Sequence, residues 1–150
     1  MTERATAAIA VALALAVAVA GCGGSSESMR KLRAQATRIC TGALAQQARI
    51  QPPPVPAATT AFLRRGIAAL RPELAQLRKL RPPSERARTY AAALGSLARA
   101  LTILTATVHD LDRGADPLTT IKTLEHRLAP VEANGNAAWR TLDVPACVNR

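Results

Sequence analysis

The stretch YAAALGSLARALTILTATVHDL, residues 90–111, is the most regular part of the chain. Apolar side chains recur in it at alternating spacings of four and three residues, as they do along one face of a helix that packs against other helices. This pattern predicts a long amphipathic helix with partners on its apolar face. The apolar positions are Tyr90, Leu94, Leu97, Leu101, Leu104, Val108 and Leu111.

Three other segments carry an apolar stripe at helical spacing. The first runs from about Met29 to Ile50 and ends at the proline-rich residues 51–56, because prolines cannot continue a helix. The second continues in register past Pro72, so we expect one kinked helix, and Pro130 is expected to bend the last one. The stripes are Leu32, Ala36, Ile39, Ala43 and Ile50, then Leu63, Ile67, Leu70, Leu74, Leu77 and Leu80, and finally Ile121, Leu124, Leu128, Val131, Ala138 and Leu142 with Trp139 beside them.

Residues between these segments have the chemistry of helix ends. Hydroxyl and carboxylate side chains cap the first turn of a helix, and glycine suits the residue after its last turn. A proline directly after the N-cap is also favourable. The predicted N-caps are Thr59 or Thr60, Ser84 followed by Glu85, and Asp116 followed by Pro117, while Gly114 is the predicted C-terminal cap.

Four amphipathic helices joined by short breaks predict an all-α fold, an antiparallel up-down four-helix bundle over residues 29–150. The composition agrees, because alanine and leucine dominate and the 150 residues include one Phe, one Tyr and one Trp. Alanine-rich stripes bury little apolar area, so we expect a covalent clip to support this thin core. The extended proline link is expected to offset the first helix along the bundle.

The N-terminal segment has the organisation of a secretory signal. Residues 1–6 are polar and include Arg4, and residues 9–20 form an unbroken apolar run. Spanning a bilayer takes roughly 20 apolar residues, so this run has the size of a signal-peptide core. A buried or interfacial helix is the alternative interpretation.

This run closes in Val19-Ala20-Gly21-Cys22, which resembles the lipobox of bacterial lipoproteins, where small residues precede a cysteine that is acylated and becomes the mature N-terminus. The resemblance implies a signal peptide over residues 1–21 and a lipidated Cys22. A flexible Gly/Ser tether is expected over residues 22–28. The implied location is the extracytoplasmic face of the cell membrane, with the protein held there by its lipid.

Lipidation of Cys22 leaves two of the three cysteines, Cys40 and Cys147. In an oxidising compartment a disulfide between them is the expected outcome. Two free thiols or a catalytic cysteine are the alternatives, although no CxxC motif or neighbouring histidine supports redox or nucleophilic chemistry.

The net charge is +10, from twenty Lys and Arg against ten Asp and Glu. In an up-down bundle the second break shares its end with the start of the first helix, which carries Arg30, Lys31 and Arg33, and lies opposite the acidic third break. We predict that this basic end faces an anionic membrane surface; a solvated face that maintains solubility is the alternative. Nucleic acid is not an expected partner, because base-stacking aromatics are missing. The second break carries Arg78, Lys79, Arg81, Arg86 and Arg88, and the third carries Asp110, Asp112 and Asp116.

No pattern of catalytic or metal-binding residues is present. His109 and His126 lie on consecutive predicted helices and could meet near Asp110, Asp112 or Glu125, but no HExxH or clustered Cys/His spacing supports a metal site. The aspartates of residues 110–116 lack the ligand alternation of a calcium loop. Neither a nucleophile elbow nor a glycine-rich phosphate loop occurs. We therefore predict a protein that is not an enzyme and needs no metal or other cofactor.

Beyond the lipobox, the early Ile39-Cys40, the proline-punctuated helices and the late Pro145-Ala146-Cys147 resemble the small disulfide-clipped helical lipoproteins of high-GC Gram-positive bacteria, a group without an assigned activity. The resemblance implies a cell-envelope location and a helical fold. The leading functional prediction is a non-catalytic interaction module that contacts another envelope protein or a wall component. The alternative is a binding protein for a small or apolar ligand held between loosely packed, alanine-lined helices.

Overall fold

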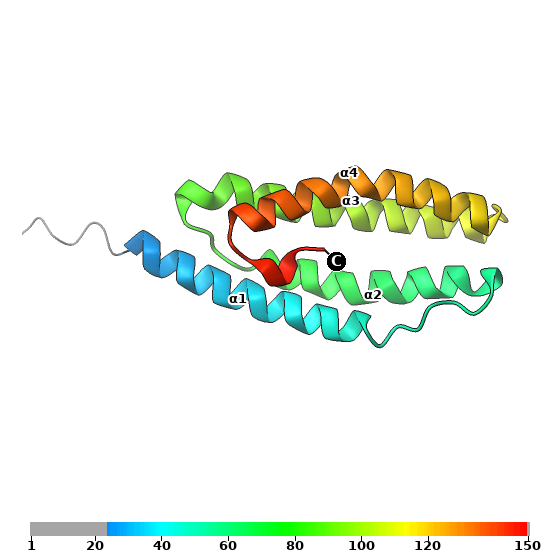
Figure 1. Ribbon diagram of the computed structural model, residues 1–150, viewed down its shortest axis with the longest axis horizontal. Coiled ribbons are helices and arrows are strands. Elements are labelled where there is room, and N and C mark those ends of the chain that lie inside the picture. Colours follow the sequence, from blue (N-terminus) through cyan, green and yellow to red (C-terminus); the bar gives the residue numbers. More distant parts are fainter. Residues whose placement is uncertain (1–23, 150) are drawn as a thin grey trace, which may run out of the picture.

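The computed structural model describes residues 24–149, and the predicted signal peptide and Cys22 lie outside this range. Successive long helices run in opposite directions along one axis (Figure 1). The predicted all-α, antiparallel up-down four-helix bundle is thereby confirmed. The helices are α1 (Gly24–Gln47), α2 (Thr59–Leu77), α3 (Ala87–Asp112) and α4 (Pro117–Thr141), with short 3₁₀ turns η1 (Pro56–Ala58), η2 (Ser84–Arg86) and η3 (Pro145–Cys147).

The C-terminal tail completes the bundle. Helix α1 packs on α2, α2 on α3, and α3 on α4, while η3 in the tail contacts both α1 and α4. Figure 1 shows the tail turning back from α4 into the space beside α1. Helix α1 is offset along the bundle, as the proline link predicted, so one end contains α2, α3 and α4 without it. One half of the molecule is therefore closed by α1 and the tail, and we call it the clipped half. The other half is built from α2, α3 and α4, and we call it the three-helix half.

Two core clusters correspond to these two halves. The clipped half contains Leu32, Ala36, Cys40, Leu77, Tyr90, Ala93, Ala138, Trp139, Leu142, Val144 and Cys147. The three-helix half contains Leu63, Ile67, Leu74, Leu101, Ile103, Val108, Leu124 and Val131. The predicted stripes supply most of both clusters, because each stripe turns toward the bundle axis.

The first helix begins at Gly24 rather than at Met29, so residues 24–28 of the predicted tether are helical. Glu27 lies in the first turn, where a carboxylate interacts favourably with the helix dipole. It also pairs with Arg30 three residues later. These two interactions give a physical reason for the earlier start.

Two of the predicted N-caps are wrong. Helix α2 follows directly on η1, so Thr59 is its first residue and is buried, and the capping residue is Ala58. Ser84 opens η2 instead of α3, and its hydroxyl lies 3.4 Å from the carboxylate of Glu85. In both places prolines promote a 3₁₀ turn ahead of the helix, which moves the cap away from the hydroxyl side chain.

The residues at the two ends of the α3–α4 turn have the capping roles predicted from the sequence. Gly114 has a φ of 89°, the left-handed conformation that glycine adopts without steric cost. The carboxylate of Asp116 accepts a hydrogen bond of 2.9 Å from the backbone N–H of Thr119, and Pro117 is the first residue of α4. Pro72 and Pro130 lie inside continuous helices, so α2 is a single helix as predicted.

The segment Ser84–Asp112 is long and apolar enough to cross a membrane, with a mean hydropathy of 1.5 over its most apolar window. Helices that pack inside proteins can have the same length and hydropathy, and α3 contacts both α2 and α4. Its residues Tyr90, Leu101 and Val108 lie in the core of the bundle.

Candidate functional site

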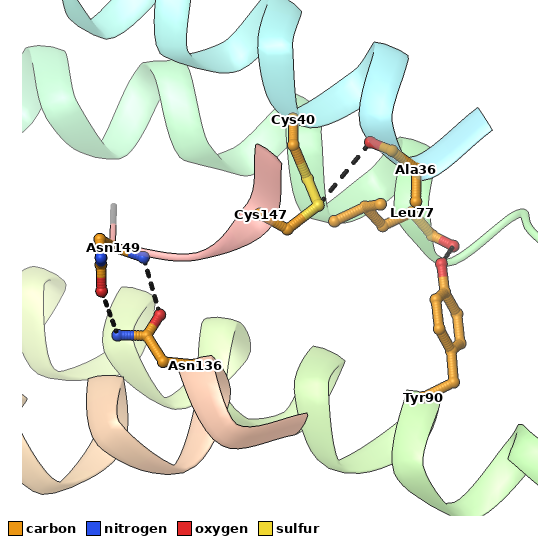
Figure 2. Close-up of a disulfide and its surroundings, with 7 residues drawn as sticks. All are labelled: Ala36, Cys40, Leu77, Tyr90, Asn136, Cys147 and Asn149. Carbon is orange, nitrogen blue, oxygen red and sulfur yellow. Dashed lines mark hydrogen bonds between the residues drawn. A yellow bond between two sulfur atoms is a disulfide. The ribbon is translucent and has the colours of Figure 1, made fainter. Parts of the chain in front are cut away.

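A disulfide joins Cys40 of α1 to Cys147 of η3, as predicted, and excludes the free-thiol and catalytic-cysteine alternatives for these two residues. The two Cα atoms are 5.3 Å apart across a sequence separation of 107 residues. Both side chains are buried, and the sulfur of Cys147 lies 3.7 Å from the carbonyl oxygen of Ala36 (Figure 2). The bond fastens the tail to the C-terminal half of α1.

Polar contacts hold the tail on both sides of the disulfide. The backbone N–H of Asn149 donates to the side-chain oxygen of Asn136 at 2.9 Å, and the amide of Asn136 donates back to Asn149 at 3.2 Å (Figure 2). On the α1 side, Nε of Arg33 donates to the carbonyl of Leu142 at 3.0 Å, and the guanidinium lies 3.6 Å from Asp143. The tail is thus tied to α4 as well as to α1.

An aromatic pair links α3 to α4. The rings of Tyr90 and Trp139 meet edge to face with centroids 5.8 Å apart. The hydroxyl of Tyr90 donates to the carbonyl of Leu77 at 2.7 Å (Figure 2). Burial raises the pKa of Tyr90 to about 12, because the charged phenolate is poorly solvated there.

A partly open cavity of about 120 Å³ lies between α2, α3 and α4, next to the disulfide. Its apolar wall comes mainly from leucine and alanine side chains, and Trp139 also lines it. Gly135 faces Ser96 so closely that a Cβ on Gly135 would come within 3.1 Å of the serine Cβ. The lining residues are Gln47, Leu70, Ala93, Ser96, Leu97, Ala100, Leu104, Leu128, Val131, Glu132, Gly135, Asn136, Trp139 and Cys147.

Gln47 is the last residue of α1 and the residue of α1 that lines the cavity. Its amide nitrogen Nε2 is buried and has no hydrogen-bond partner within residues 24–149. Sequence reasoning missed Gln47, since a glutamine at the end of an amphipathic helix is ordinarily solvent-exposed.

The basic residues of the second break lie together at one end of the bundle, between α2 and α3. All five are exposed: Arg78, Lys79, Arg81, Arg86 and Arg88. None of the ion pairs found in the described part of the chain includes them. The first turns of α1, with exposed Lys31, lie at the same end (Figure 1). We call the five side chains of the second break the basic patch: Arg78, Lys79, Arg81, Arg86 and Arg88.

The acidic turn at the opposite end has a different character, because its carboxylates have partners. Asp112 binds Arg64 of α2 at 2.7 Å, and Asp110 binds Arg113 at 2.7 Å. Asp116 caps α4, and the backbone hydrogen bond from Thr119 lowers its pKa. This turn therefore does not present a free acidic surface.

His109 and His126 are both exposed. Among the described residues no group of three or more His, Cys, Asp or Glu side chains is close enough to hold a metal ion. Glu73 is a buried carboxyl group on α2, 2% exposed, that sequence reasoning also missed, because it occupies a position on the apolar side of a helix predicted from its leucines.

No family model matches the chain, and no curated protein or solved structure is significantly similar to it. The site is therefore interpreted from its own chemistry.

Proposed function

We propose that this protein is a lipid-anchored, extracytoplasmic protein without catalytic activity, which holds its basic end against an anionic membrane surface. The observation that carries the proposal is the charge asymmetry of the bundle. The basic patch is exposed and without an ion pair in the described part of the chain, whereas the carboxylates at the other end are paired or capping.

The position of the basic patch supports this orientation. A lipid on Cys22 would place the start of α1 next to the membrane, and the basic patch lies at that same end (Figure 1). A lysine or arginine near an anionic leaflet contributes about 1 kcal/mol, and one acyl signal combined with a polybasic patch gives durable anchoring. The opposite end and the outer helix faces would then be available to an envelope protein or a wall component.

Sedimentation with vesicles tests the proposal. Oxidised residues 24–150 without lipid should bind vesicles that contain anionic phospholipid, should lose binding at high salt, and should not bind neutral vesicles. Neutralising the basic patch with glutamines should abolish binding. The matched control neutralises five other exposed basic residues, also four arginines and one lysine, and should retain binding: Arg65, Arg71, Arg99, Lys122 and Arg127. Equal losses of binding in the two variants would show that only net charge matters. If the protein bound neither anionic nor neutral vesicles, the proposed orientation would be refuted.

A second function, binding of a small apolar ligand inside the bundle, is favoured by the cavity beside Trp139. Cavities of this kind, lined by aliphatic side chains, accept apolar molecules. Trp139 is the single tryptophan of the chain, so the tryptophan fluorescence comes from a residue that lines the cavity. Saturable quenching by 1-bromohexane is expected. Ala100→Leu, which fills the cavity, should abolish it, and Ala91→Leu on the exposed side of α3 should not. Quenching that is linear and identical in both variants would contradict a ligand site.

A further inference from the structure

We infer that a groove between α3 and α4 binds a soluble phosphate ester, whose phosphate oxygens accept hydrogen bonds from the guanidinium groups of Arg99 and Arg127. This site is separate from the basic patch and goes beyond the membrane contact proposed above. It follows from three properties of the groove: two arginines from neighbouring helices line it, no carboxylate is among its described lining residues, and it lies far from the basic end of the bundle.

The groove is an open space of about 910 Å³ between α3 and α4. Its lining on α3 includes the small residues Ala92, Gly95 and Ser96, which leave room beside the two long arginine side chains. Most of the lining residues are exposed. A charged ligand would therefore keep part of its hydration in the groove and would avoid the penalty of a fully buried charge.

Arg99 of α3 and Arg127 of α4 are the cationic groups of the groove. Both are exposed, and neither takes part in an ion pair or hydrogen bond within residues 24–149. A guanidinium presents its N–H groups as a planar fork that matches the oxygens of a phosphate. Because the two forks come from different helices, they can approach one phosphate from two sides.

The rest of the lining favours an anion with several oxygens. The amide of Asn134 and the hydroxyl of Ser96 are further donors in the groove, and no contact within residues 24–149 uses either. Arg127 also lines a second hollow toward the α3–α4 turn, but the one carboxylate there, Asp110, is already bound by Arg113. A phosphate, with three acceptor oxygens and nearly two charges, would use these donors more fully than a carboxylate with two oxygens.

The position of the groove decides between a lipid headgroup and a soluble ester as the source of the phosphate. Arg99 lies twelve residues after Ala87, the first residue of α3, which is about 18 Å along the helix at 1.5 Å per residue. The start of α3 belongs to the basic end, so in the proposed orientation the groove lies beyond the Debye length of about 8 Å from the headgroups. The source thus rests on the proposed orientation, whereas the anion site itself does not.

The experiment uses the full chain reconstituted in phosphatidylcholine vesicles, with equilibrium dialysis of radiolabelled glycerol 3-phosphate as the readout and protein-free vesicles as the blank. Saturable binding is expected. Unlabelled glycerate, which carries a carboxylate instead of the phosphate, should compete about 5-fold more weakly, the value expected for the loss of one net hydrogen bond. Glycerol should not compete.

Variants assign the binding to the two arginines. Arg99→Gln combined with Arg127→Gln should weaken it about 10-fold, a modest loss because solvent weakens exposed charge pairs. The matched control is Arg65→Gln combined with Arg71→Gln, two exposed arginines of α2 that do not line the groove, and it should bind like the unchanged protein. Replacing Arg99 and Arg127 with lysine keeps the charge but removes the forks, so its loss should be intermediate.

Vesicles that contain phosphatidic acid supply the arm for the lipid source. The affinity for glycerol 3-phosphate should be the same in these vesicles as in phosphatidylcholine vesicles, because headgroups do not reach the groove. A loss of binding in the phosphatidic acid vesicles would show that a headgroup occupies the site, and the soluble source would be wrong.

The outcomes separate this inference from the proposed membrane contact. If glycerol 3-phosphate does not bind saturably, or if the two glutamine variants lose binding equally, the phosphate site is refuted. If glycerate competes as well as the phosphate ester, the ligand class is wrong. The membrane contact is judged separately by sedimentation, since the control variant in that experiment already lacks Arg99 and Arg127 and should still bind anionic vesicles. The helical circular-dichroism signal of each variant confirms that it is folded.

Discussion

The clipped half and the three-helix half of the bundle are built from the same kind of residues but are closed to different degrees. In the clipped half every core side chain except Ala138 is at most 3% exposed. In the three-helix half each core side chain remains 5–8% exposed. All of the largest fully buried side chains belong to the clipped half: Leu32, Leu77, Leu142, Val144, Cys40 and Cys147.

The difference shows what the first helix and the tail contribute. Leucine, isoleucine and valine dominate the three-helix cluster, so its greater exposure does not result from a more polar composition. We attribute it to the end of α1 at Gln47, which leaves this half with three helices. In the clipped half α1 and η3 cover the core, and the disulfide joins them. The cavity lies where the two halves meet.

Removing the disulfide should break this comparison most strongly. The chain-entropy model gives a stabilisation of about 4–5 kcal/mol for closing a loop of about a hundred residues, and measured values are often lower. Cys40→Ala combined with Cys147→Ala should therefore lower the free energy of unfolding by about 2–5 kcal/mol in urea titrations. Hydrogen exchange should accelerate first in α1. Uniform acceleration along all four helices would contradict the separate character of the two halves.

A matched pair of leucines on α2 measures the difference in packing. Leu77 is 0% exposed in the clipped half, and Leu74, nearly one turn earlier, is 5% exposed in the three-helix half. Leu77→Ala should cost about 3–4 kcal/mol and Leu74→Ala about 2–3 kcal/mol, because the more closed surroundings relax less around the new cavity. Thermal unfolding of both variants checks the order. A larger loss for Leu74→Ala would show that residual exposure does not report packing here.

Tyr90 makes the stability of the clipped half depend on pH. Tyr90→Phe removes the hydrogen bond to the carbonyl of Leu77 and should cost about 1 kcal/mol. In the folded protein the pKa of Tyr90 is raised from 10.0 to about 12 by burial. The native state therefore keeps the proton that the unfolded chain releases, so this contribution is fully present below pH 10 and is lost as the pH rises through about 12.

Absorbance at 295 nm follows this titration directly, since the chain contains one tyrosine. Unfolding experiments between pH 9 and pH 12 should show a decline in stability that is smaller in Tyr90→Phe. An unchanged decline would assign the alkaline sensitivity to other groups.

The smallest effect is expected at the far end of the three-helix half. The hydrogen bond from the Thr119 backbone lowers the pKa of Asp116, so the capping contribution is present above the ordinary aspartate pKa and is lost as the pH falls through the lowered value. Asp116→Ala should fray the first turn of α4 and reduce the stability less than any change above. Hydrogen exchange at Thr119 and Thr120 reports it, with Asp116→Asn as a variant that retains capping ability. Faster exchange in the clipped half would be unexpected.

Much of the fold could be predicted from the sequence, because periodicity identifies helices and short breaks limit their arrangement. The stripe of residues 90–111, the cap at Asp116 and the pairing of Cys40 with Cys147 are all found in the structure. The N-caps at Thr59 and Ser84 were predicted wrongly because a hydroxyl near a helix start looks the same whether or not a 3₁₀ turn intervenes.

The candidate site could be predicted only in part. The five residues of the basic patch come from one local run of sequence, and their exposure follows from their charge. The cavity depends on where α1 ends relative to Leu70 and Trp139, a distance that no local pattern encodes. The pairing of Asp112 with Arg64 is equally non-local, across 48 positions, so the acidic turn looked free in the sequence.

The disulfide also determines how the molecule would carry mechanical load. A pull applied between residues 24 and 149 enters along the first part of α1, crosses from Cys40 to Cys147 through a covalent bond, and leaves along the end of the tail. The 106 residues between the two cysteines lie outside this load path, since their number is one less than the sequence separation of 107. With the bond intact, tension between the ends can unwind only the start of α1 and the last residues of the tail, and α2, α3 and α4 stay unstretched.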